Sequence, residues 1–218
     1  MCNLASNAAN NWLRLPYIRG GGDANRLYVE IRFSMRRCTN YPDSARLQSC
    51  KEAFKLLYYE AESDFANAMM PTWDDATYRH VDVVAADRTF SDPKTAPPIN
   101  TETRSITVSA GGVYFALHDQ GACTTVLSMR VYYVVCASVI VDFAVFPNTS
   151  TGTDTTSVVQ AYGTCVANAA FDDQRQPLYL CQADGNWSSY RTSGCHCQPG
   201  YQPGPSGTTE CLGELLYH

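Results

Sequence analysis

Residues 26–35 read R-L-Y-V-E-I-R-F-S-M, and this stretch decides the fold class. Apolar side chains occupy every second position: Leu27, Val29, Ile31, Phe33 and Met35. Because successive side chains of a strand point to opposite faces, this period of two predicts a half-buried β-strand. The same bias toward β-branched and aromatic residues recurs at residues 105–108, 113–117 and 124–135. Many strands joined by Gly-, Pro- and Asn-rich turns predict an all-β sandwich.

Residues 51–70 are ambiguous by their local pattern. An amphipathic helix would gather four apolar side chains on one face: Phe54, Leu57, Tyr58 and Ala61. A strand would place three of them on one face: Phe54, Leu56 and Tyr58. The pattern alone favours the helix.

The cysteines indicate an oxidising compartment. There are ten: Cys2, Cys38, Cys50, Cys123, Cys136, Cys165, Cys181, Cys195, Cys197 and Cys211. Metal sites use closely spaced pairs such as C-x-x-C, which do not occur in this sequence, so disulfides are the better interpretation. Two N-glycosylation sequons begin at Asn148 and Asn186 and agree with a secreted route.

The composition argues against a disordered chain and against a nucleic-acid-binding protein. Hydrophobic residues make up 45% of the 218 residues, which is ordinary for a globular protein. The net charge of −5 is spread along the chain and gives no reason to expect nucleic acid as a partner. The basic residues are mostly arginine, which suits protein interfaces better than lysine.

The ends of the chain suggest a longer parent. Residues 1–3 have neither the basic start nor the apolar core of a signal peptide. The longest uncharged apolar stretch, residues 131–141, is too short to cross a bilayer. A disulfide-rich chain without these elements is expected to be part of a longer protein.

The composition changes near Cys136, after which cysteines become frequent among Gly, Pro and Ser. Cys181 is followed by Gly185, Trp187 and Cys195, and this C…G-x-W…C pattern resembles a sushi (complement-control) module. Four cysteines allow three pairings. The sushi resemblance implies Cys136–Cys181 and Cys165–Cys195. Residues 197–211 then resemble the first loop of a growth-factor-like repeat, with Cys197 paired to Cys211.

Motifs for catalysis do not occur in the sequence. No serine lies in a G-x-S-x-G turn, and residues 20–22 lack the G-K-[ST] ending of a phosphate loop. The four histidines are scattered, and no acidic cluster suited to calcium is apparent. We therefore predict no catalytic residue, no metal and no cofactor.

A series of blocks along the chain resembles the ligand-binding domain of Eph receptors. The blocks are N-W-L-R at 11–14, R-L-Y-V-E-I-R-F at 26–33, C-K-E-A-F at 50–54, Y-Y-E at 58–60, V-D at 81–82, A-A-D at 85–87, I-N-T-E at 99–102, Y-F-A-L at 114–117, Q-G-A-C at 120–123 and R-V-Y-Y at 130–133. They follow the family order, and the sushi-like and cysteine-rich parts follow in family order too. Residues 63–75 resemble the longer loop of the B class.

This resemblance implies a galactose-binding-like jelly-roll β-sandwich, in which residues 51–60 form a strand rather than a helix. It implies the disulfides Cys2–Cys123 and Cys38–Cys50. The expected domains are an ephrin-binding jelly roll at 1–136 whose opening strands are missing, a sushi-like module at 137–196 and a truncated growth-factor-like repeat at 197–218.

The resemblance also implies a site and a partner. Ephrins insert an apolar loop into a channel of the receptor. Thr125 and Leu127 match its floor, and Arg36 matches the arginine that meets a ligand carboxylate. The two bridges place Cys38, Cys50 and Cys123 beside this channel. The plainer alternatives are core packing for Leu127 and a solvated strand arginine for Arg36.

The expected function is therefore ephrin binding on the extracellular side of the plasma membrane, with possible receptor clustering. The parent protein would resemble a receptor tyrosine kinase whose catalytic domain is absent from this chain. Three alternatives remain: a soluble decoy, an incomplete fragment, or a glycan-binding jelly roll. The last would need exposed aromatic side chains beside polar groups, or a calcium site.

Overall fold

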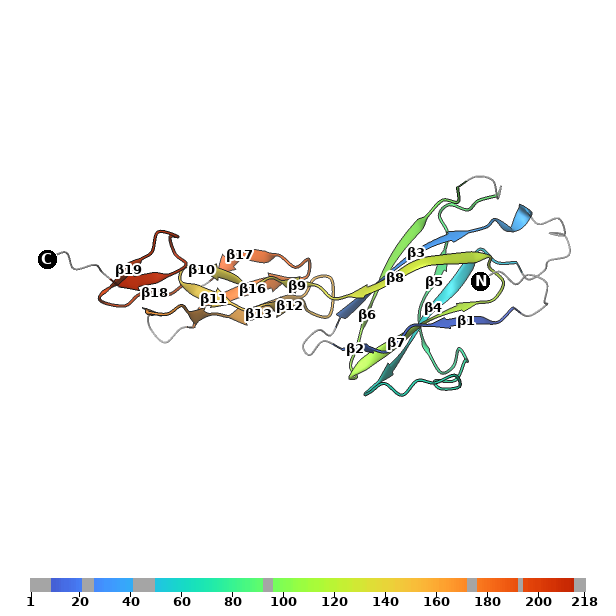
Figure 1. Ribbon diagram of the computed structural model, residues 1–218, viewed down its shortest axis with the longest axis horizontal. Coiled ribbons are helices and arrows are strands. Elements are labelled where there is room, and N and C mark those ends of the chain that lie inside the picture. The colour runs from blue at the N-terminus through green and yellow to red at the C-terminus, as the bar shows by residue number, and fades with distance from the viewer. Residues whose placement is uncertain are drawn as a thin grey trace. The chain divides into compact units, whose positions relative to one another are not determined.

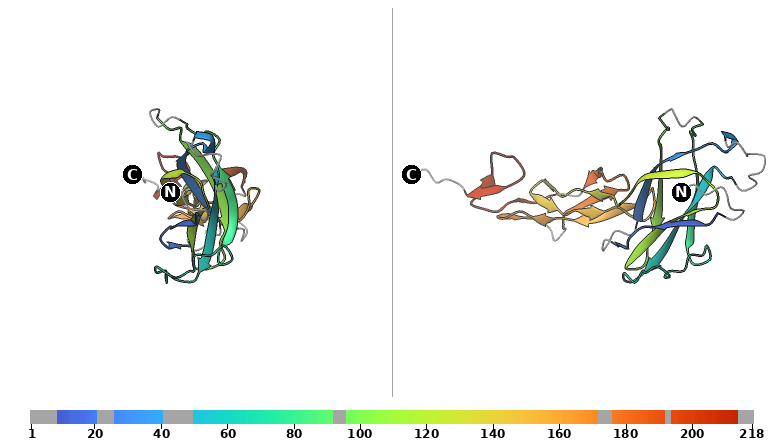
Figure 2. Two further views of the ribbon diagram at one scale, coloured as in Figure 1. Left: turned by 90° about the vertical axis from the view of Figure 1, so that its right-hand side faces the viewer. Right: turned by 45° about the vertical axis from the view of Figure 1, so that its right-hand side comes forward.

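The structure is a computed structural model that describes residues 9–20, 26–40, 50–91, 96–171, 176–191 and 194–213. The chain forms two compact units, residues 1–132 and 133–218. The strands of the first are long and those of the second are short (Figures 1 and 2). Within these described ranges, both units are built of β-strands, with one short 3₁₀ turn at Cys38–Asn40. In the described part of the chain, no helix has the length and apolar character needed to cross a membrane.

The first unit is a sandwich of two sheets (Figure 1). One sheet has the order β1-β7-β4-β5, with β2 also paired to β7. Its strands are β1 (Asn11–Arg14), β2 (Ile18–Arg19), β4 (Ala53–Ala61), β5 (Arg79–Ala85) and β7 (Gly112–Asp119). The other sheet has the order β6-β3-β8, formed by β6 (Asn100–Thr107), β3 (Arg26–Met35) and β8 (Thr124–Tyr132). The predicted all-β sandwich is confirmed.

The predicted alternation of β3 builds the core. Its odd-numbered apolar residues are at most 2% exposed, and they are Leu27, Val29, Ile31, Phe33 and Met35. They pack against Phe54 and Leu56 of β4 and against Phe115 of β7. Phe33 and Phe54 meet edge to face across the sandwich, with 5.1 Å between their ring centres. The even-numbered residues of β3 therefore form the outer face of the β6-β3-β8 sheet.

The ambiguous segment is a strand, and its structure explains the ambiguity. Leu56 of β4 belongs to the core between the sheets, whereas Leu57 packs on the opposite face with Tyr78 and Ala116. Because both faces of β4 are covered, apolar residues occur on both of them, and their spacing resembles that of a helix.

Residues 62–78 cover the outer face of β4 and β7. Arg14 holds this segment: its guanidinium donates to the carbonyl oxygens of Asn67 (2.6 Å) and Met70 (2.8 Å) and lies 4.6 Å from the centre of the Trp73 ring. The Tyr114 hydroxyl donates to Asp64 at 2.6 Å. The segment is therefore packed on the sheet as an ordered layer.

Asp75 closes this layer through two hydrogen bonds. Its carboxylate lies 2.6 Å from Nδ1 of the buried His118 and accepts a hydrogen bond from Lys55. Burial works to raise the pKa of Asp75, but the hydrogen bonds from Lys55 and His118 outweigh it and lower that pKa below its ordinary value. The ionised carboxylate is thus the form that the folded state favours.

We expect acid to loosen residues 62–78 first. A carboxyl with a lowered pKa in the folded state contributes stability above its ordinary pKa, and this contribution is lost as the pH falls through the folded value. Hydrogen exchange of residues 62–78 should therefore accelerate below about pH 4, relative to exchange in β3. In Asp75→Asn this acceleration of hydrogen exchange at low pH should be absent. If the variant shows the same acceleration as the wild type, protonation of Asp75 is not its cause.

The second unit is a set of small sheets held by three disulfides. Its strands are β9 (Val135–Cys136), β10 (Val139–Val141), β11 (Ala144–Phe146), β12 (Thr149–Ser150), β13 (Val158–Tyr162), β14 (Thr164–Cys165), β15 (Ala169–Ala170), β16 (Leu178–Gln182), β17 (Trp187–Arg191), β18 (His196–Cys197), β19 (Tyr201–Pro203) and β20 (Cys211–Gly213). They pair as β10-β11-β14, β12-β9, β13-β16-β17, β15-β18 and β19-β20. The bridges are Cys136–Cys181, Cys165–Cys195 and Cys197–Cys211, the pairings implied by the resemblances.

Trp187 fills the small core of this unit, as its position before Cys195 suggested. It stacks on Tyr179 with 4.7 Å between ring centres, and its indole N–H donates to the Ala137 carbonyl at 2.8 Å. Cys211 lies in the same apolar cluster as Phe143. The compact units divide just before Tyr133, whereas the sequence analysis divided the chain at Cys136. Cys136 falls in the second unit because it is bonded to Cys181.

Candidate functional site

The candidate site lies at one end of the outer face of β3 and β8. Ser34 is paired with Thr125 and Met35 with Thr124, so the two strands run antiparallel to the end of β3. One residue further, the Arg36 amide donates to the Cys123 carbonyl at 3.0 Å. Residues directly opposite each other on paired strands share a face, so this register places Arg36 next to Ser34 and Thr125. The site is thus assembled from residues that are far apart in sequence.

Leu127 is exposed because of a β-bulge. The pairing of β3 with β8 shifts between Arg32 and Phe33, which face Ser128 and Val126. The extra residue of β8 is Leu127, and 51% of it is exposed, while Val126 packs against the core. Core packing was the plainer interpretation of Leu127, and the structure excludes it. An apolar side chain therefore stands on the surface beside the exposed Thr125.

A bridged segment borders the site. Cys38 and Cys50 form a disulfide with 5.8 Å between their Cα atoms, as the resemblance implied. The Cys38 amide donates to Glu52 at 2.8 Å, and the Lys51 amide donates to the Gly121 carbonyl at 3.0 Å. Both ends of the bridged segment are thus held by hydrogen bonds to neighbouring parts of the first unit. Residues 41–49 within it lie outside the described residues.

A second segment supports Arg36 from its other side. Phe90 forms a parallel β-bridge with Arg36 and accepts a hydrogen bond from the Arg37 amide at 2.9 Å. The Arg37 guanidinium donates to the Thr89 hydroxyl at 3.1 Å. The backbone of Arg36 is therefore held between Cys123 and Phe90, and its side chain is half-buried.

Asp119 positions Cys123, and the sequence analysis missed this role. Asp119 is fully buried, and its Oδ1 accepts hydrogen bonds from the amides of Gly121 (2.9 Å) and Ala122 (2.6 Å). Its Oδ2 accepts a hydrogen bond from the Asn11 side chain at 3.3 Å. The carboxylate thereby fixes the turn between β7 and β8. An aspartate before Gln-Gly is a turn signal that could have identified it.

The predicted bridge from Cys123 to Cys2 stays a prediction, because Cys2 lies outside the described residues. Within the described ranges, no group of three or more His, Cys, Asp or Glu residues could hold a metal ion. The site is therefore a surface with one apolar side chain, one arginine and hydroxyl groups. Such a surface suits recognition of a protein segment that presents an apolar group and a carboxylate.

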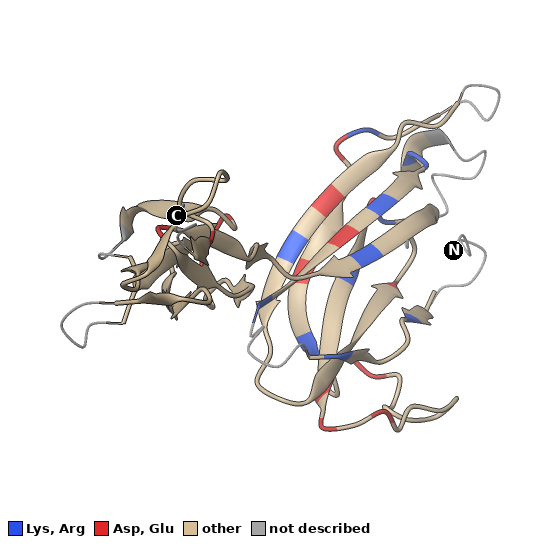
Figure 3. Ribbon diagram, turned by 60° about the vertical axis from the view of Figure 1, so that its left-hand side comes forward, with Lys and Arg blue, Asp and Glu red and all other residues tan. Residues whose placement is uncertain are grey.

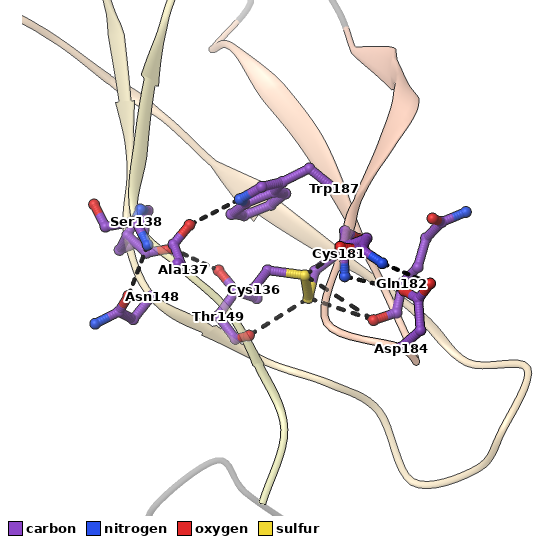
Figure 4. The surroundings of a disulfide bond; sticks show 11 residues. Cys136, Ala137, Ser138, Asn148, Thr149, Cys181, Gln182, Asp184 and Trp187 are labelled. Atoms are coloured by element: carbon purple, nitrogen blue, oxygen red, sulfur yellow. Dashed lines mark hydrogen bonds between the residues drawn. A yellow bond between two sulfur atoms is a disulfide. The ribbon is translucent and has the colours of Figure 1, made fainter.

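The two predicted glycosylation sites differ in their local structure. Asn148 lies near the Cys136–Cys181 disulfide (Figure 4), and the Asn186 carbonyl oxygen lies 3.4 Å from the Cys136 sulfur. Asn148 is exposed and uses its carbonyl oxygen, which accepts a hydrogen bond from the Ser138 amide at 2.7 Å. Asn186 uses its amide nitrogen, which donates to Asp184 at 2.9 Å in the turn before Trp187. A glycan is attached at the amide nitrogen, so only at Asn186 would it replace one of these hydrogen bonds.

We expect secreted chains to carry a glycan on Asn148 at higher occupancy than on Asn186. Glycopeptide mass spectrometry of the two sequons measures this directly. Asn148→Gln should remove most of the mass that a glycosidase releases, and Asn186→Gln should change it little. Higher occupancy at Asn186 would show that its hydrogen bond to Asp184 does not limit modification.

Comparisons with known proteins match both units. The family model of the ephrin receptor ligand binding domain matches residues 1–136, and that of the ephrin cysteine rich domain matches residues 137–197. Ephrin type-B receptor 3 of Mus musculus is 42% identical over 204 residues, which cover 93% of this chain and 20% of that protein. Ephrin type-B receptor 2 of Gallus gallus is 42% identical over 217 residues, which cover 98% of this chain and 21% of that protein. The chain thus spans about a fifth of the length of these relatives.

Proposed function

The chain belongs to the ephrin receptor family, and on this premise we propose that it binds ephrins through the outer face at the end of β3 and β8. The observation that carries the proposal is Leu127. It is apolar, half exposed and adjacent to Thr125, at the end of the sheet where Arg36 follows β3. An apolar ligand loop would bury Leu127, and Arg36 would receive a ligand carboxylate.

Arg36, Thr125 and Leu127 would make the direct contacts in this proposal. The Cys38–Cys50 bridge would hold one border of the site, and Cys123 would hold Arg36 through its carbonyl. A guanidinium forms two parallel hydrogen bonds to a carboxylate, which fixes the register of a ligand as well as adding affinity. Burial of Leu127 would add about 25 cal/mol for each Å² of apolar surface removed from water.

The finer domain assignment is also a proposal. Residues 1–136 would form the ephrin-binding domain, residues 137–196 a sushi-like module and residues 197–218 the start of a growth-factor-like repeat. Neither matched family domain is a kinase domain. Display on the extracellular side of the plasma membrane, contact with ephrins on an apposed cell, receptor clustering and signalling through a kinase would be properties of a longer parent protein.

The test is binding of a panel of A- and B-class ephrin ectodomains to the secreted 218-residue chain, measured on a biosensor. Because the two relatives described above are type-B receptors, we expect the B-class ephrins to bind more tightly. Saturable binding that free ephrin competes away would support the proposal. A folded monomer with all its disulfides that binds no ephrin would refute it.

A further inference from the structure

A second charged surface lies on the same sheet face, beyond the candidate site. It comprises Arg26, Arg32, Arg130, Tyr28 and Tyr132, and we call it the arginine strip. The even-numbered residues of β3 and their partners on β8 place all five on the outer face: Arg32 faces Ser128, Glu30 faces Arg130, and Tyr28 faces Tyr132. Figure 3 shows bands of basic residues on neighbouring strands of this unit, with acidic bands between them.

The strip is positive although the chain as a whole has a net charge of −5. Its three arginines are opposed by Glu30, which lies between them and approaches Arg130 at 3.5 Å. Arg32 is exposed, and in the described part of the chain it forms no ion pair. The side chain of Arg130 is 65% exposed. Both guanidinium groups are therefore open to a ligand, and the local charge favours an anionic one.

Aromatic rings fix two of the arginines. Tyr28 and Tyr132 stack with 5.3 Å between their centres and 12° between their planes. The guanidinium of Arg26 lies 4.8 Å from the Tyr28 centre, and that of Arg130 lies 4.7 Å from the Tyr132 centre. Arg26 is buried and also donates to the Ser105 hydroxyl at 3.0 Å. Side chains held in this way lose less conformational entropy when they bind a ligand.

The shape of the strip favours a linear polyanion. Successive outward residues of a strand are about 6.8 Å apart, so the exposed Arg32 lies about 14 Å along β3 from Tyr28, whose partner on β8 is Tyr132. The neighbouring strand β6 adds a row of exposed hydroxyls at Thr101, Thr103 and Ser105. A chain of spaced anions could contact several of these groups at once, whereas a single small anion could reach only one or two.

We propose that the arginine strip binds a sulfated glycosaminoglycan. The guanidinium group matches oxyanions with its planar set of donors, and a locally positive surface attracts polyanions. The same face carries the half-buried rings of Tyr28 and Tyr132 beside exposed hydroxyl groups of β6. The choice of a glycan over nucleic acid rests on the extracellular location in the proposed function.

The experiment measures binding of the secreted 218-residue chain to immobilised heparin, and the NaCl concentration at which it elutes. Arg32→Ala/Arg130→Ala removes the two exposed guanidinium groups. Arg19→Ala/Arg79→Ala is the matched control, because it removes the same charge from β2 and β5 of the other sheet. Glu30→Gln removes the carboxylate that lies between the arginines of the strip, so it should strengthen heparin binding.

We expect the strip variant to bind heparin about tenfold more weakly, as the loss of two charge-assisted contacts at an exposed site predicts. The control variant should change binding less than threefold. Glu30→Gln should elute at higher NaCl than the wild type, which a purely structural role of Glu30 would not produce. Fully desulfated heparin should not bind.

Three results would overturn the proposal: equal losses in the strip and control variants, equal binding of desulfated heparin, or no retention of the wild type at 0.15 M NaCl, an ionic strength of about the physiological value. Ephrin binding measured on the same samples separates this proposal from the previous one. The strip variant should keep its ephrin affinity, since Arg32 and Arg130 lie outside the candidate site. A failure of ephrin binding by the wild type would leave the heparin result interpretable.

Discussion

Arg36→Ala should weaken ephrin binding by about thirty- to a hundredfold, the loss expected when a central arginine of an interface is truncated. The backbone of Arg36 is fixed by Cys123 and Phe90, and its side chain is half-buried. A carboxylate bound there is partly shielded from water, which makes its pairing with the guanidinium stronger than that of an exposed pair.

Arg32→Ala is the matched control for Arg36. Arg32 lies on β3, which Arg36 directly follows, and on the same face. It is exposed and is paired with Ser128 on the far side of the bulge. We expect its loss to change ephrin affinity by less than threefold. Arg36→Lys keeps the charge but not the planar fork of donors, so its affinity should fall between those of the wild type and the alanine variant. Equal losses in Arg36→Ala and Arg32→Ala on a biosensor would remove Arg36 from the site.

Asp119→Ala should lower the free energy of unfolding of the first unit by about 3 kcal/mol. The buried carboxylate accepts hydrogen bonds from the amides of Gly121 and Ala122, and each buried donor left without an acceptor costs about 1–3 kcal/mol. The effect should reach the candidate site, because the same turn places the Cys123 carbonyl that holds Arg36. Ephrin affinity should therefore fall as well.

The measurement is hydrogen exchange during urea unfolding, followed in peptides from β7 and β8. Asp119→Asn keeps an acceptor oxygen for the turn and should retain most of the stability. Asp74→Ala is an exposed control in the same unit: Asp74 also accepts a hydrogen bond from a nearby amide, that of Ala76 at 3.3 Å. Its loss should cost under about 1 kcal/mol. If Asp119→Ala lowers the free energy of unfolding no more than the control variant does, the hydrogen bonds of Asp119 do not hold the turn.

Much of the fold follows from local pattern. The alternation along β3 predicted both the strand and the side chains that face the core, and Leu27, Val29 and Ile31 are buried as expected. Gly185 and Trp187 before Cys195 predicted a small disulfide-bonded module, and Trp187 does pack against its core. The disulfide pairings required the family resemblance, because the order of cysteines in a sequence permits many connectivities.

Residues 51–70 show where local pattern fails. Leu56 and Leu57 are both buried, one in the core between the sheets and one beneath residues 62–78. A strand covered on both faces loses its alternation, so its sequence cannot be told from that of a helix. Residues 62–78 fold back on the sheet and bury the second face of β4. Local spacing in the sequence does not reveal this long-range contact, so it could not distinguish the strand from a helix.

By itself, the sequence determined the class of the protein: an all-β, disulfide-stapled chain with a recognition domain and without catalytic motifs. Only the tertiary structure decided what is exposed on its surface. Leu127 is outside because a bulge inserts one residue into β8, and Asp119 matters because its carboxylate reaches two turn amides. The arginine strip exists because register aligns Arg130 and Tyr132 of β8 with Glu30 and Tyr28 of β3. Periodicity along one strand fixes which side chains share its face, whereas their neighbours on the next strand depend on long-range pairing.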